Sequence, residues 1–362
     1  MANSNLTSAK KAKNDEFYTQ YQDIEKEINA YLEYNPDVFK GKTLLLPCDD
    51  PEWSNFTKFF AQNFERLRLK KLISTSYAPE SKNFKNGYQP TIFEQSDPQF
   101  DKSKTITNGK IFTLTHDITG DGKVDFDDIQ WHYLEGNGDF KSNEIKRLRD
   151  EADIIVTNPP FSLFREFLSW IIEAGKQFLV IGNMNAITYK EVFPLIKNDK
   201  LWLGNGFHAG NAYFSTPLAK EYAEGVYNPD TGLVKFRNVC WFTNIDHGRR
   251  HQPLPLMTAG DNLKYSKHKE IKGRDAYKKY DNYDSIEVPF TDSIPSDYDG
   301  VMGVPISFLD KYSPDQFEII GATESEGKGF SEGLWNEKSK VSQPLVDQER
   351  VYKRIFIRHR KK

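Results

Sequence analysis

Four consecutive residues, Asn158-Pro159-Pro160-Phe161, bring together the groups of this chain that are best suited to chemistry. Proline fixes φ and favours an extended conformation in the residue before it, so the Asn158 amide oxygen and the Pro159 carbonyl oxygen are held in place as acceptors. An exocyclic amine needs two acceptors in its plane and a flat surface on which to stack, and the Phe161 ring can supply that surface. The pattern predicts methyl transfer to the amino group of a nucleobase.

The sequence on either side predicts a strand before this motif and a helix after it. The apolar run 153–157 precedes the motif, and the apolar residues of 162–168 recur at helical spacing. The alternative interpretation is an ordinary loop, because two prolines can follow any strand and a four-residue match can arise by chance. The strand–turn–helix context favours the catalytic interpretation.

Strands and helices alternate along the first 200 residues. The predicted strands are 42–47, 70–77, 110–114, 153–157 and 177–182. Residues 15–20 lead into a predicted helix that ends at about residue 34, and the other predicted helices are 54–67, 162–174 and 191–197. This alternation indicates an α/β fold with a doubly wound, mostly parallel sheet, in which ligands bind at the carboxyl ends of the strands. The turn at Asp49-Asp50 and the turn at Asn158 both belong to that edge.

The composition limits the class of protein. The 362 residues are 38% hydrophobic and 14% aromatic, and the net charge of −3 excludes a polycation, so any contact with nucleic acid depends on local basic clusters. Two cysteines, Cys48 and Cys240, provide neither a disulfide framework nor a zinc site, which fits a reducing cytoplasm. No apolar run is long enough to span a bilayer, and residues 1–13 lack the apolar region of a signal peptide. We therefore expect a cytoplasmic protein with no membrane partner.

An acidic segment, 117–128, fits the pattern of a calcium-binding loop of the EF-hand type, with glycine at its sixth position. The side chains or carbonyls at its ligand positions belong to Asp117, Thr119, Asp121, Lys123, Asp125 and Asp128. Asp128 is shorter than the usual Glu at the last position, which weakens a bidentate contact. A calcium site and an acidic surface turn are the two interpretations, and we expect a structural role at most.

Basic residues gather in the second half of the chain. The segment 264–279 holds seven Lys and Arg residues against two acidic ones, with tyrosines among them. Such runs are often solvated faces, but their separation from the Asn158 motif favours contact with DNA phosphates. The predicted DNA-binding residues are Arg249, Arg250, Lys264, Lys267, Lys269, Lys272 and Arg274.

Several motifs, in order along almost the whole chain, resemble those of the EcoRI-type adenine-specific DNA methyltransferases, which use S-adenosylmethionine. They are the segments 15–21, 48–51 with 54–56, 138–140, 157–166, 187–193, 280–284 and 298–306. Many amino-methyltransferases share Asn-Pro-Pro-Phe, whereas the other motifs in this order are far more specific. The resemblance implies a Rossmann-like methyltransferase sheet, a C-terminal target-recognition region, and methylation of N6 of an adenine flipped out of double-stranded DNA at a specific sequence.

The resemblance also implies how the chain is organised. Residues 1–13 form a flexible N-terminus, and 14–200 form the S-adenosylmethionine-binding catalytic domain, with an insertion at about 79–137. Residues 201–362 form the DNA target-recognition region, with strands that complete the sheet and a basic tail. A single chain that carries both halves can act as a monomer, and a restriction endonuclease of the same system is a candidate partner.

By the same resemblance, one set of residues surrounds the cofactor. The set is Phe17, Tyr18, Thr19, Cys48, Asp49, Asp50, Ser54, Asp139 and Phe140. Asp139 is expected to contact the adenine ring of the cofactor, and Phe140 to stack on it. Related methyltransferases carry a glycine-rich loop after the first strand, which this chain lacks, but carboxylates there suit the positive charges of S-adenosylmethionine.

Cys48 follows a proline, as the nucleophile of cytosine-C5 methyltransferases does. It lies in the cofactor loop, however, and the chain has no Glu-Asn-Val motif to accompany such a nucleophile. We therefore interpret Cys48 as a small buried thiol and expect Cys48→Ser to leave activity largely intact.

Three other functions are compatible with the Asn158 motif. Methylation of cytosine N4 needs the same acceptors, and methylation of a protein side-chain amide can use the same four residues. An inactive DNA-binding relative is the third, which the intact motif disfavours. Identifying the methylated product separates all of them.

Overall fold

The computed structural model describes residues 17–47, 49, 54–78, 95–207, 211–216, 219–223, 225–323, 330–331, 333–335 and 342–360. The chain forms two compact units, residues 1–183 with 206–245, and residues 184–205 with 246–362. The predicted N-terminal segment 1–13 and residues 79–94 of the predicted insertion lie outside the described residues. Within the described ranges, no helix is long and apolar enough to cross a membrane.

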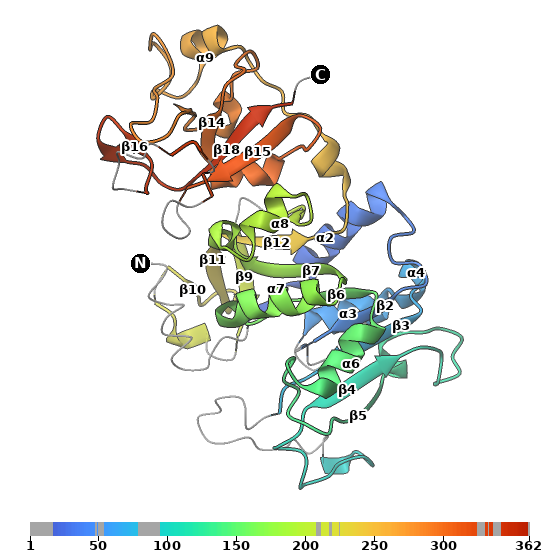
Figure 1. Cartoon of the computed structure of the whole chain (residues 1–362). Coiled ribbons are helices and arrows are strands. Elements are labelled where there is room, and N and C mark those ends of the chain that lie inside the picture. The colour runs from blue at the N-terminus through green and yellow to red at the C-terminus, as the bar shows by residue number, and fades with distance from the viewer. Residues whose placement is uncertain are drawn as a thin grey trace. The chain divides into compact units, whose positions relative to one another are not determined.

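A large mixed sheet forms the centre of the first unit (Figure 1). Its strands in this unit follow the order β5-β4-β3-β2-β6-β7-β12. Their bounds are β2 Thr43–Leu46, β3 Lys71–Thr75, β4 Lys110–Leu114, β5 Gln130–Tyr133, β6 Ile154–Thr157, β7 Gln177–Asn183 and β12 Val239–Thr243.

The four neighbouring strands β3, β2, β6 and β7 run parallel to one another. Every residue of β2 and β6 is buried, as expected for parallel strands covered on both faces. The strand predicted at 110–114 is present as β4, but it pairs antiparallel with β3, and β5 and β12 are also antiparallel to their neighbours. The sheet is therefore mixed.

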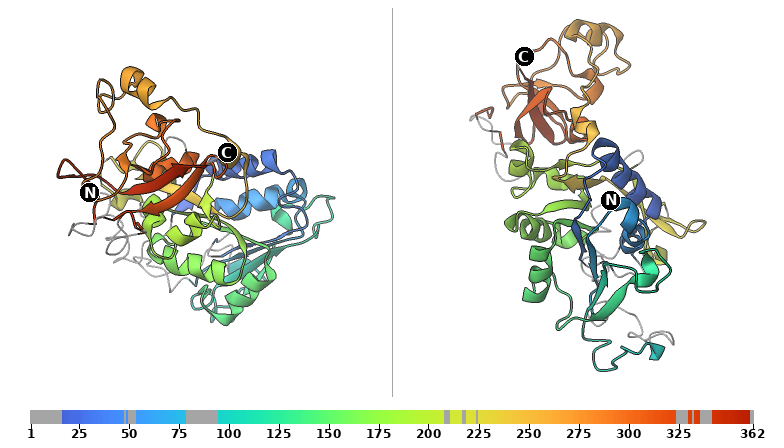
Figure 2. Two further views of the ribbon diagram at one scale, coloured as in Figure 1. Left: turned by 45° about the horizontal axis from the view of Figure 1, so that its top comes forward. Right: turned by 90° about the vertical axis from the view of Figure 1, so that its right-hand side faces the viewer.

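Helices cover both faces of this sheet (Figure 2, right). On one face, α2 (Tyr21–Tyr34), α3 (Asn55–Gln62) and α4 (Phe64–Leu67) bury residues such as Ile28 and Phe59 with alternate residues of the strands. On the other face lie α6 (Asn143–Glu151) and α7 (Phe164–Glu173), where the Phe164 ring lies 5.0 Å from that of Phe242. The strands therefore alternate their side chains between two apolar layers.

Local chemistry sets the ends of the helices that flank the predicted site. The Ser54 hydroxyl accepts the Phe56 N–H at 3.1 Å and so caps α3, at the position where the predicted helix 54–67 begins. That helix is interrupted at Asn63, which separates α3 from α4. The predicted helix 162–174 begins with a 3-10 turn, Phe161–Leu163, that continues into α7.

A second, smaller sheet in the same unit has the order β1-β9-β11-β10 and is antiparallel throughout. Its strands are β1 Tyr18–Thr19, β9 Asn211–Ser215, β10 Tyr227–Asn228 and β11 Leu233–Arg237. Thus the first described residues of the chain pair with a segment almost 200 residues later. The predicted boundary at residue 200 does not coincide with the limits of the compact units, because 206–245 adds β9, β11 and β12 to the first unit.

The second unit is built on a sheet of the order β13-β14-β18-β15 and a separate hairpin, β16–β17. Their bounds are β13 Ile286–Glu287, β14 Met302–Pro305, β15 Phe317–Ala322, β16 Leu345–Val346, β17 Glu349–Arg350 and β18 Arg354–His359. The unit also contains β8 (Trp202–Leu203) and the helices α8 (Phe193–Lys197) and α9 (Ala259–Tyr265). A buried ion pair between Arg354 and Glu287 joins β18 to β13 at 2.6 Å.

Candidate active site

Three loops follow the carboxyl ends of parallel strands in the first unit. One follows β2 and leads to Ser54, one follows β3, and one follows β6 and contains Asn158. The segment 137–140 lies against the loop after β3, since the Ala78 N–H donates to the Asn137 carbonyl at 2.8 Å. Gly138 has a φ of +85°, and a Cβ atom there would lie 2.3 Å from the Ser76 carbonyl oxygen, so only glycine permits this approach.

Asp49 links two of these loops. Its side chain is buried, with one oxygen accepting the Ser54 hydroxyl at 2.8 Å and the other accepting the Thr157 hydroxyl. The Asp49 backbone carbonyl also accepts the Thr57 hydroxyl at 3.2 Å. The loop after β2, the start of α3 and the end of β6 are thereby fixed to one another.

Asn158 presents a donor to the protein and an acceptor to the site. Its Nδ2 donates to the Phe17 carbonyl at 2.6 Å, whereas its Oδ1 is buried and has no hydrogen-bond partner among the described residues. The Pro160 carbonyl accepts the Leu163 N–H at 2.9 Å and closes the 3-10 turn. Within the described part of the chain, the Pro159 carbonyl has no such backbone partner. Neither acceptor is therefore paired with a backbone donor of the described residues.

An aromatic surface stands beside these acceptors. The Phe161 ring is half-buried and stacks on the Phe17 ring, with 5.8 Å between centroids and 25° between planes. The rings of Phe214 on β9 and Phe236 on β11 lie edge-on to Phe161, at 6.3 and 6.4 Å. The small sheet thus supports the ring that we predict to stack on a nucleobase.

The residues predicted to surround the cofactor fall into three groups. Thr19 is buried in β1, and its Oγ1 has no hydrogen-bond partner among the described residues. Tyr18 is half-buried beside it, and Phe17 is 6% exposed. Asp49 and Ser54 bond to each other, as described above, while Cys48 and Asp50 lie outside the described residues.

Asp139 and Phe140 lie in the loop that passes the carboxyl end of β3. One Asp139 carboxylate oxygen accepts the Lys141 N–H at 2.9 Å, and the side chain is half-buried. The Phe140 ring is only 2% exposed and packs edge-on against Phe167 and Trp170 of α7, at 5.2 and 5.7 Å. The stacking predicted for Phe140 would require its ring to leave this packing, so the structure gives the ring a core role.

Sequence reasoning gave Asn55 no role of its own. Its Nδ2 donates to the Thr19 carbonyl at 2.8 Å and so ties α3 to β1. Asn158 makes a similar bond to the carbonyl of Phe17, the residue directly before β1, across 141 residues of sequence. Both acceptors are backbone carbonyls, which leave no trace in the sequence.

The acidic segment 117–128 forms a loop whose carboxylates turn inward. Asp128 accepts backbone N–H groups of Thr119, Asp125 and Ile118, and these bonds lower its pKa to about 2. Asp117 accepts the N–H groups of Gly120 and Gly122. No group of three or more His, Cys, Asp or Glu residues in the described ranges is arranged to hold a metal ion, so the predicted calcium site finds no support.

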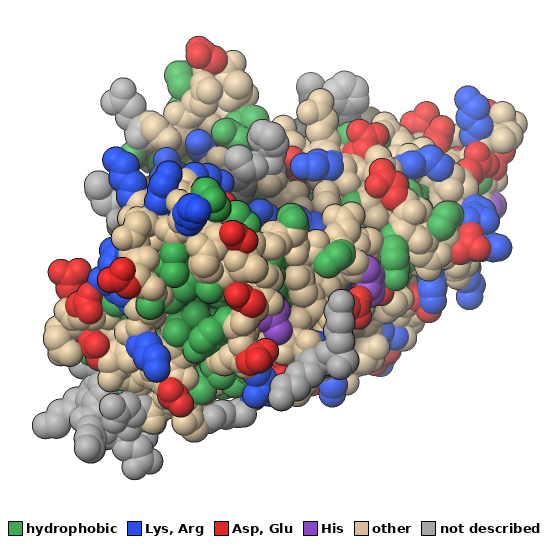
Figure 3. All heavy atoms as spheres, turned by 90° about the horizontal axis from the view of Figure 1, so that it is seen from above, with side chains coloured by type: hydrophobic (Ala, Val, Ile, Leu, Met, Phe, Trp, Pro, Cys, Tyr) green, Lys and Arg blue, Asp and Glu red, His purple; other side chains and the backbone are tan. Residues whose placement is uncertain are grey.

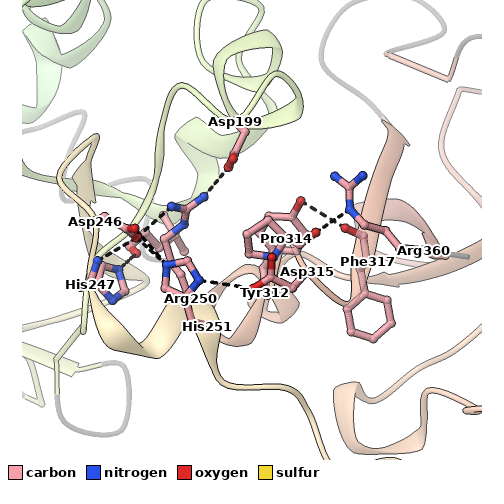
Figure 4. A network of polar contacts seen from close by, with 11 residues as sticks. Asp199, Asp246, His247, Arg250, His251, Tyr312, Pro314, Asp315, Phe317 and Arg360 are labelled. Atoms are coloured by element: carbon pink, nitrogen blue, oxygen red, sulfur yellow. Dashed lines mark hydrogen bonds and ion pairs between the residues drawn. The ribbon is translucent and has the colours of Figure 1, made fainter. Parts of the chain in front are cut away.

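Arg250 occupies a buried position in the second unit (Figure 4). Its guanidinium group pairs with Asp199 and, at 3.0 Å, with Asp246, and it lies 3.6 Å from the centroid of the Trp202 ring. The structure contradicts the prediction that Arg250 contacts DNA, because its charge is already paired and its side chain is 8% exposed. Arg249 donates to the Asn205 carbonyl and is half-buried.

The other predicted DNA-binding residues are exposed, on α9 and the segment that follows it. Lys264 lies 4.9 Å from the centroid of the exposed Tyr265 ring, and Lys267 pairs with Asp292 at 2.8 Å. Arg274 donates to the Glu270 carbonyl, and Lys269 and Lys272 are exposed. Figure 3 shows one face of the molecule on which Lys and Arg side chains gather at the upper left, with Asp and Glu side chains scattered elsewhere.

Comparisons with known proteins identify the family of this chain. A model of the family described as adenine-specific methyltransferase EcoRI matches residues 5–360. The chain is 43% identical to the type II methyltransferase M.EcoRI of Escherichia coli, over 88% of this chain and 89% of that protein. It is 36% identical to the type II methyltransferase M.MpnI of Mycoplasma pneumoniae, over 86% of this chain and 83% of that protein.

A third relative, the type II methyltransferase M.MgeORF184P of Mycoplasma genitalium, is 34% identical over 97% of both chains. Comparison with solved structures gives no significant match. The family model and these relatives cover almost the whole chain, including both compact units. This protein therefore belongs to the EcoRI family of adenine-specific methyltransferases.

Proposed function

We propose that the protein transfers a methyl group from S-adenosylmethionine to N6 of an adenine at a specific sequence in double-stranded DNA. The observation that carries this proposal is the buried Oδ1 of Asn158, which has no hydrogen-bond partner among the described residues. Burying an acceptor without a partner costs about 1–3 kcal/mol, so such an atom at the carboxyl edge of a sheet is best explained by a ligand that donates to it.

The target base must leave the helical stack, since its amino group is paired and covered inside a duplex. Asn158 Oδ1 and the Pro159 carbonyl would each accept one amino hydrogen, and the Phe161 ring would stack on the base. Accepting both hydrogens draws the nitrogen lone pair out of conjugation with the ring. Alignment of that lone pair, together with fixed dipoles, then supplies most of the rate enhancement, and no covalent enzyme intermediate is needed.

The residues around the β2 and β3 loops fit S-adenosylmethionine. Asp139 is half-buried in the loop that passes the carboxyl end of β3, where this fold class binds its ligands. Thr19 in β1 is joined to the start of α3 through Asn55, and its Oγ1 has no partner among the described residues. When bound, the cofactor supplies an electrophilic methyl group on a sulfonium centre. Thr19 and Asp139 would contact it directly, whereas Asp49 and Ser54 would hold the shape of the loop.

The four parallel strands, with helices on both faces, support the doubly wound, Rossmann-like methyltransferase sheet expected from the sequence. We propose that the second unit contains the target-recognition region, and that its exposed residues Lys264, Lys269, Lys272 and Arg274 hold the DNA through contacts with phosphates. The tyrosine and lysine side chains of α9 resemble the mixture of aromatic and basic groups that binds nucleic acid.

The test is to incubate the protein with S-adenosylmethionine labelled on its methyl group and with plasmid DNA, and then to digest the DNA to nucleosides. Labelled N6-methyladenine is the expected product. Labelled N4-methylcytosine, or label in protein instead of DNA, would replace the proposal by one of the alternatives. Absence of any labelled product from folded protein, on DNA from several unmethylated hosts, would overturn it.

A further inference from the structure

Phe17 makes two contacts with the groups that handle the target base. Its carbonyl accepts the Asn158 Nδ2–H at 2.6 Å, and its ring stacks on Phe161 with 5.8 Å between centroids. Resemblance to known methyltransferases assigned Phe17 to the wall of the cofactor pocket. Neither of these two contacts requires a cofactor, and both involve the motif that begins at Asn158.

The bond to the carbonyl determines which way the Asn158 amide faces. A side-chain amide is planar, with its donor nitrogen and its acceptor oxygen on opposite sides. When the Phe17 carbonyl holds Nδ2, the amide cannot rotate without losing that bond, so Oδ1 must point to the other side. Oδ1 is the buried atom that has no partner among the described residues.

The Phe17 ring also limits where a base can stack. A base inserted between two rings needs about 7 Å between their planes, which is two van der Waals separations of about 3.5 Å. The Phe17 and Phe161 centroids are 5.8 Å apart, so this space is closed. The target base must therefore use the opposite face of Phe161, with Phe17 behind the ring as a support.

Phe17 directly precedes β1, and β1 is itself held at a fixed place. β1 pairs with β9, where Tyr18 faces Ser215 and Thr19 faces Phe214. The Asn55 amide adds a bond of 2.8 Å to the Thr19 carbonyl. Asn55 directly follows Ser54, which bonds to Asp49, so the loop after β2 is connected through β1 to the Asn158 loop.

We propose, on the basis of the proposed function, that Phe17 is a positioning residue for the target adenine and that Asn55 holds it in place. The Phe17 carbonyl orients the Asn158 amide so that Oδ1 faces the amino group. The Phe17 ring keeps Phe161 at the angle needed for stacking. Neither residue takes part in the transfer of the methyl group.

Three variants separate this role from a cofactor wall. Phe17→Leu removes the ring, Asn55→Ala loosens β1 while leaving the ring, and Tyr222→Leu serves as a control. The Tyr222 ring contacts Phe17 and Phe236 at 6.2 and 6.0 Å, whereas the rings described beside Phe161 are those of Phe17, Phe214 and Phe236. It therefore reports on general loss of aromatic packing in the same cluster.

For each variant we would measure the Kd of S-adenosylmethionine by calorimetry without DNA, and the single-turnover methylation rate with cofactor and DNA both saturating. The DNA would carry the methylated sequence, mapped beforehand with the wild-type enzyme. A second duplex with 2-aminopurine at the target position would report stacking of the extruded base through its fluorescence.

We expect Phe17→Leu and Asn55→Ala to leave the cofactor Kd within about twofold and to lower the saturated rate about three- to tenfold, the effect of one aromatic pair. Phe17→Leu should also change the 2-aminopurine fluorescence, and Tyr222→Leu should change neither quantity. A tenfold rise in cofactor Kd with an unchanged saturated rate would return Phe17 to the cofactor wall. An equal loss of rate in Tyr222→Leu would attribute the effect to packing.

If Phe17→Leu fails to fold, Asn55→Ala decides, and a wild-type saturated rate in that variant overturns the proposal. If the wild-type enzyme forms no N6-methyladenine, the proposed function is overturned. If the wild-type enzyme is active and the variants are as active as the wild type, only the positioning role of Phe17 is overturned.

Discussion

Replacing Asn158 by alanine should make the protein no less stable and almost inactive. The substitution removes one hydrogen bond, from Nδ2 to the Phe17 carbonyl at 2.6 Å, which contributes about 1 kcal/mol to the free energy of unfolding. It also removes the buried Oδ1 that has no partner among the described residues, which relieves about 1–3 kcal/mol. The two terms oppose each other, so we expect the melting temperature to stay the same or to rise.

The effect on catalysis should be far larger. Removing a group that stabilises a transition state through one directed hydrogen bond lowers kcat by about 10²–10³ in a comparable enzyme site. The Pro159 carbonyl and the Phe161 ring would remain, so a low residual rate is expected. Cofactor affinity, measured by calorimetry, should not change, because Asn158 is assigned to the target base.

Asn244 provides a matched control in the same unit. Its Nδ2 donates to the Lys176 carbonyl at 3.0 Å, and its Oδ1 accepts the Phe178 N–H at 2.9 Å. Asn244→Ala leaves both backbone groups unpaired and should cost about 2 kcal/mol of stability, with little change in kcat. The reasoning fails if Asn158→Ala turns over at a normal rate, or if it is destabilised as much as Asn244→Ala.

Three further predictions follow from the structure. Thr19→Val should raise the melting temperature of the cofactor-free protein and weaken S-adenosylmethionine binding about tenfold in calorimetry, because it removes a buried hydroxyl with no partner in the described chain. Lys272→Ala should make the negative slope of log K for DNA against log salt shallower by about 0.9, whereas Arg250→Ala should leave that slope unchanged and destabilise the fold by about 3 kcal/mol. Burial lowers the pKa of His247 to about 4 from 6.5, so the folded protein keeps this side chain neutral at a pH where the unfolded chain protonates it. The contribution of His247 to the free energy of unfolding is therefore complete above pH 6.5, and it is lost by about 1.4 kcal/mol per pH unit as the pH falls toward 4. His247→Gln should flatten that part of the stability curve, and an unchanged curve would contradict the assignment.

The parallel core of the fold could be predicted from the sequence because its strands are buried on both faces. The segment 43–46 is apolar at three of its four positions and is buried throughout, and a short run of this kind favours a strand covered on both faces. The direction of β4 could not be predicted in the same way. The residues of β4 suit a parallel strand and an antiparallel strand equally well. The direction of β4 depends on the connection from β3, residues 76–109, whose sequence shows no regular pattern of apolar residues.

Some features of the candidate site could likewise be predicted from the sequence, and others could not. The side chains of Asn158 and Phe161 could be predicted because their types and order are distinctive. The bond from Asn158 to Phe17 could not, since its acceptor is a backbone carbonyl and its position depends on pairing of β1 with β9. For Arg250 the sequence predicted a DNA contact that the structure contradicts. Two adjacent basic residues look the same in a sequence whether an arginine is exposed to solvent or, like Arg250, buried against Trp202.

Hydrogen bonding separates the residues that shape the site from those that serve a ligand. Asp49, Ser54 and Asn55 bond to other protein groups, and the Asp49 carboxylate already holds two hydroxyls. The buried Oγ1 of Thr19 and Oδ1 of Asn158 have no partner in the described chain. Unpaired buried atoms such as Trp170 Nε1 also occur elsewhere, so the absence of a partner does not identify a site by itself. Thr19, however, is joined through Asn55 to the start of α3, which follows the carboxyl end of β2. An unpaired atom at that place gains a hydrogen bond when a ligand binds, and this gain makes Thr19 a stronger candidate than Asp49 for direct contact with the cofactor.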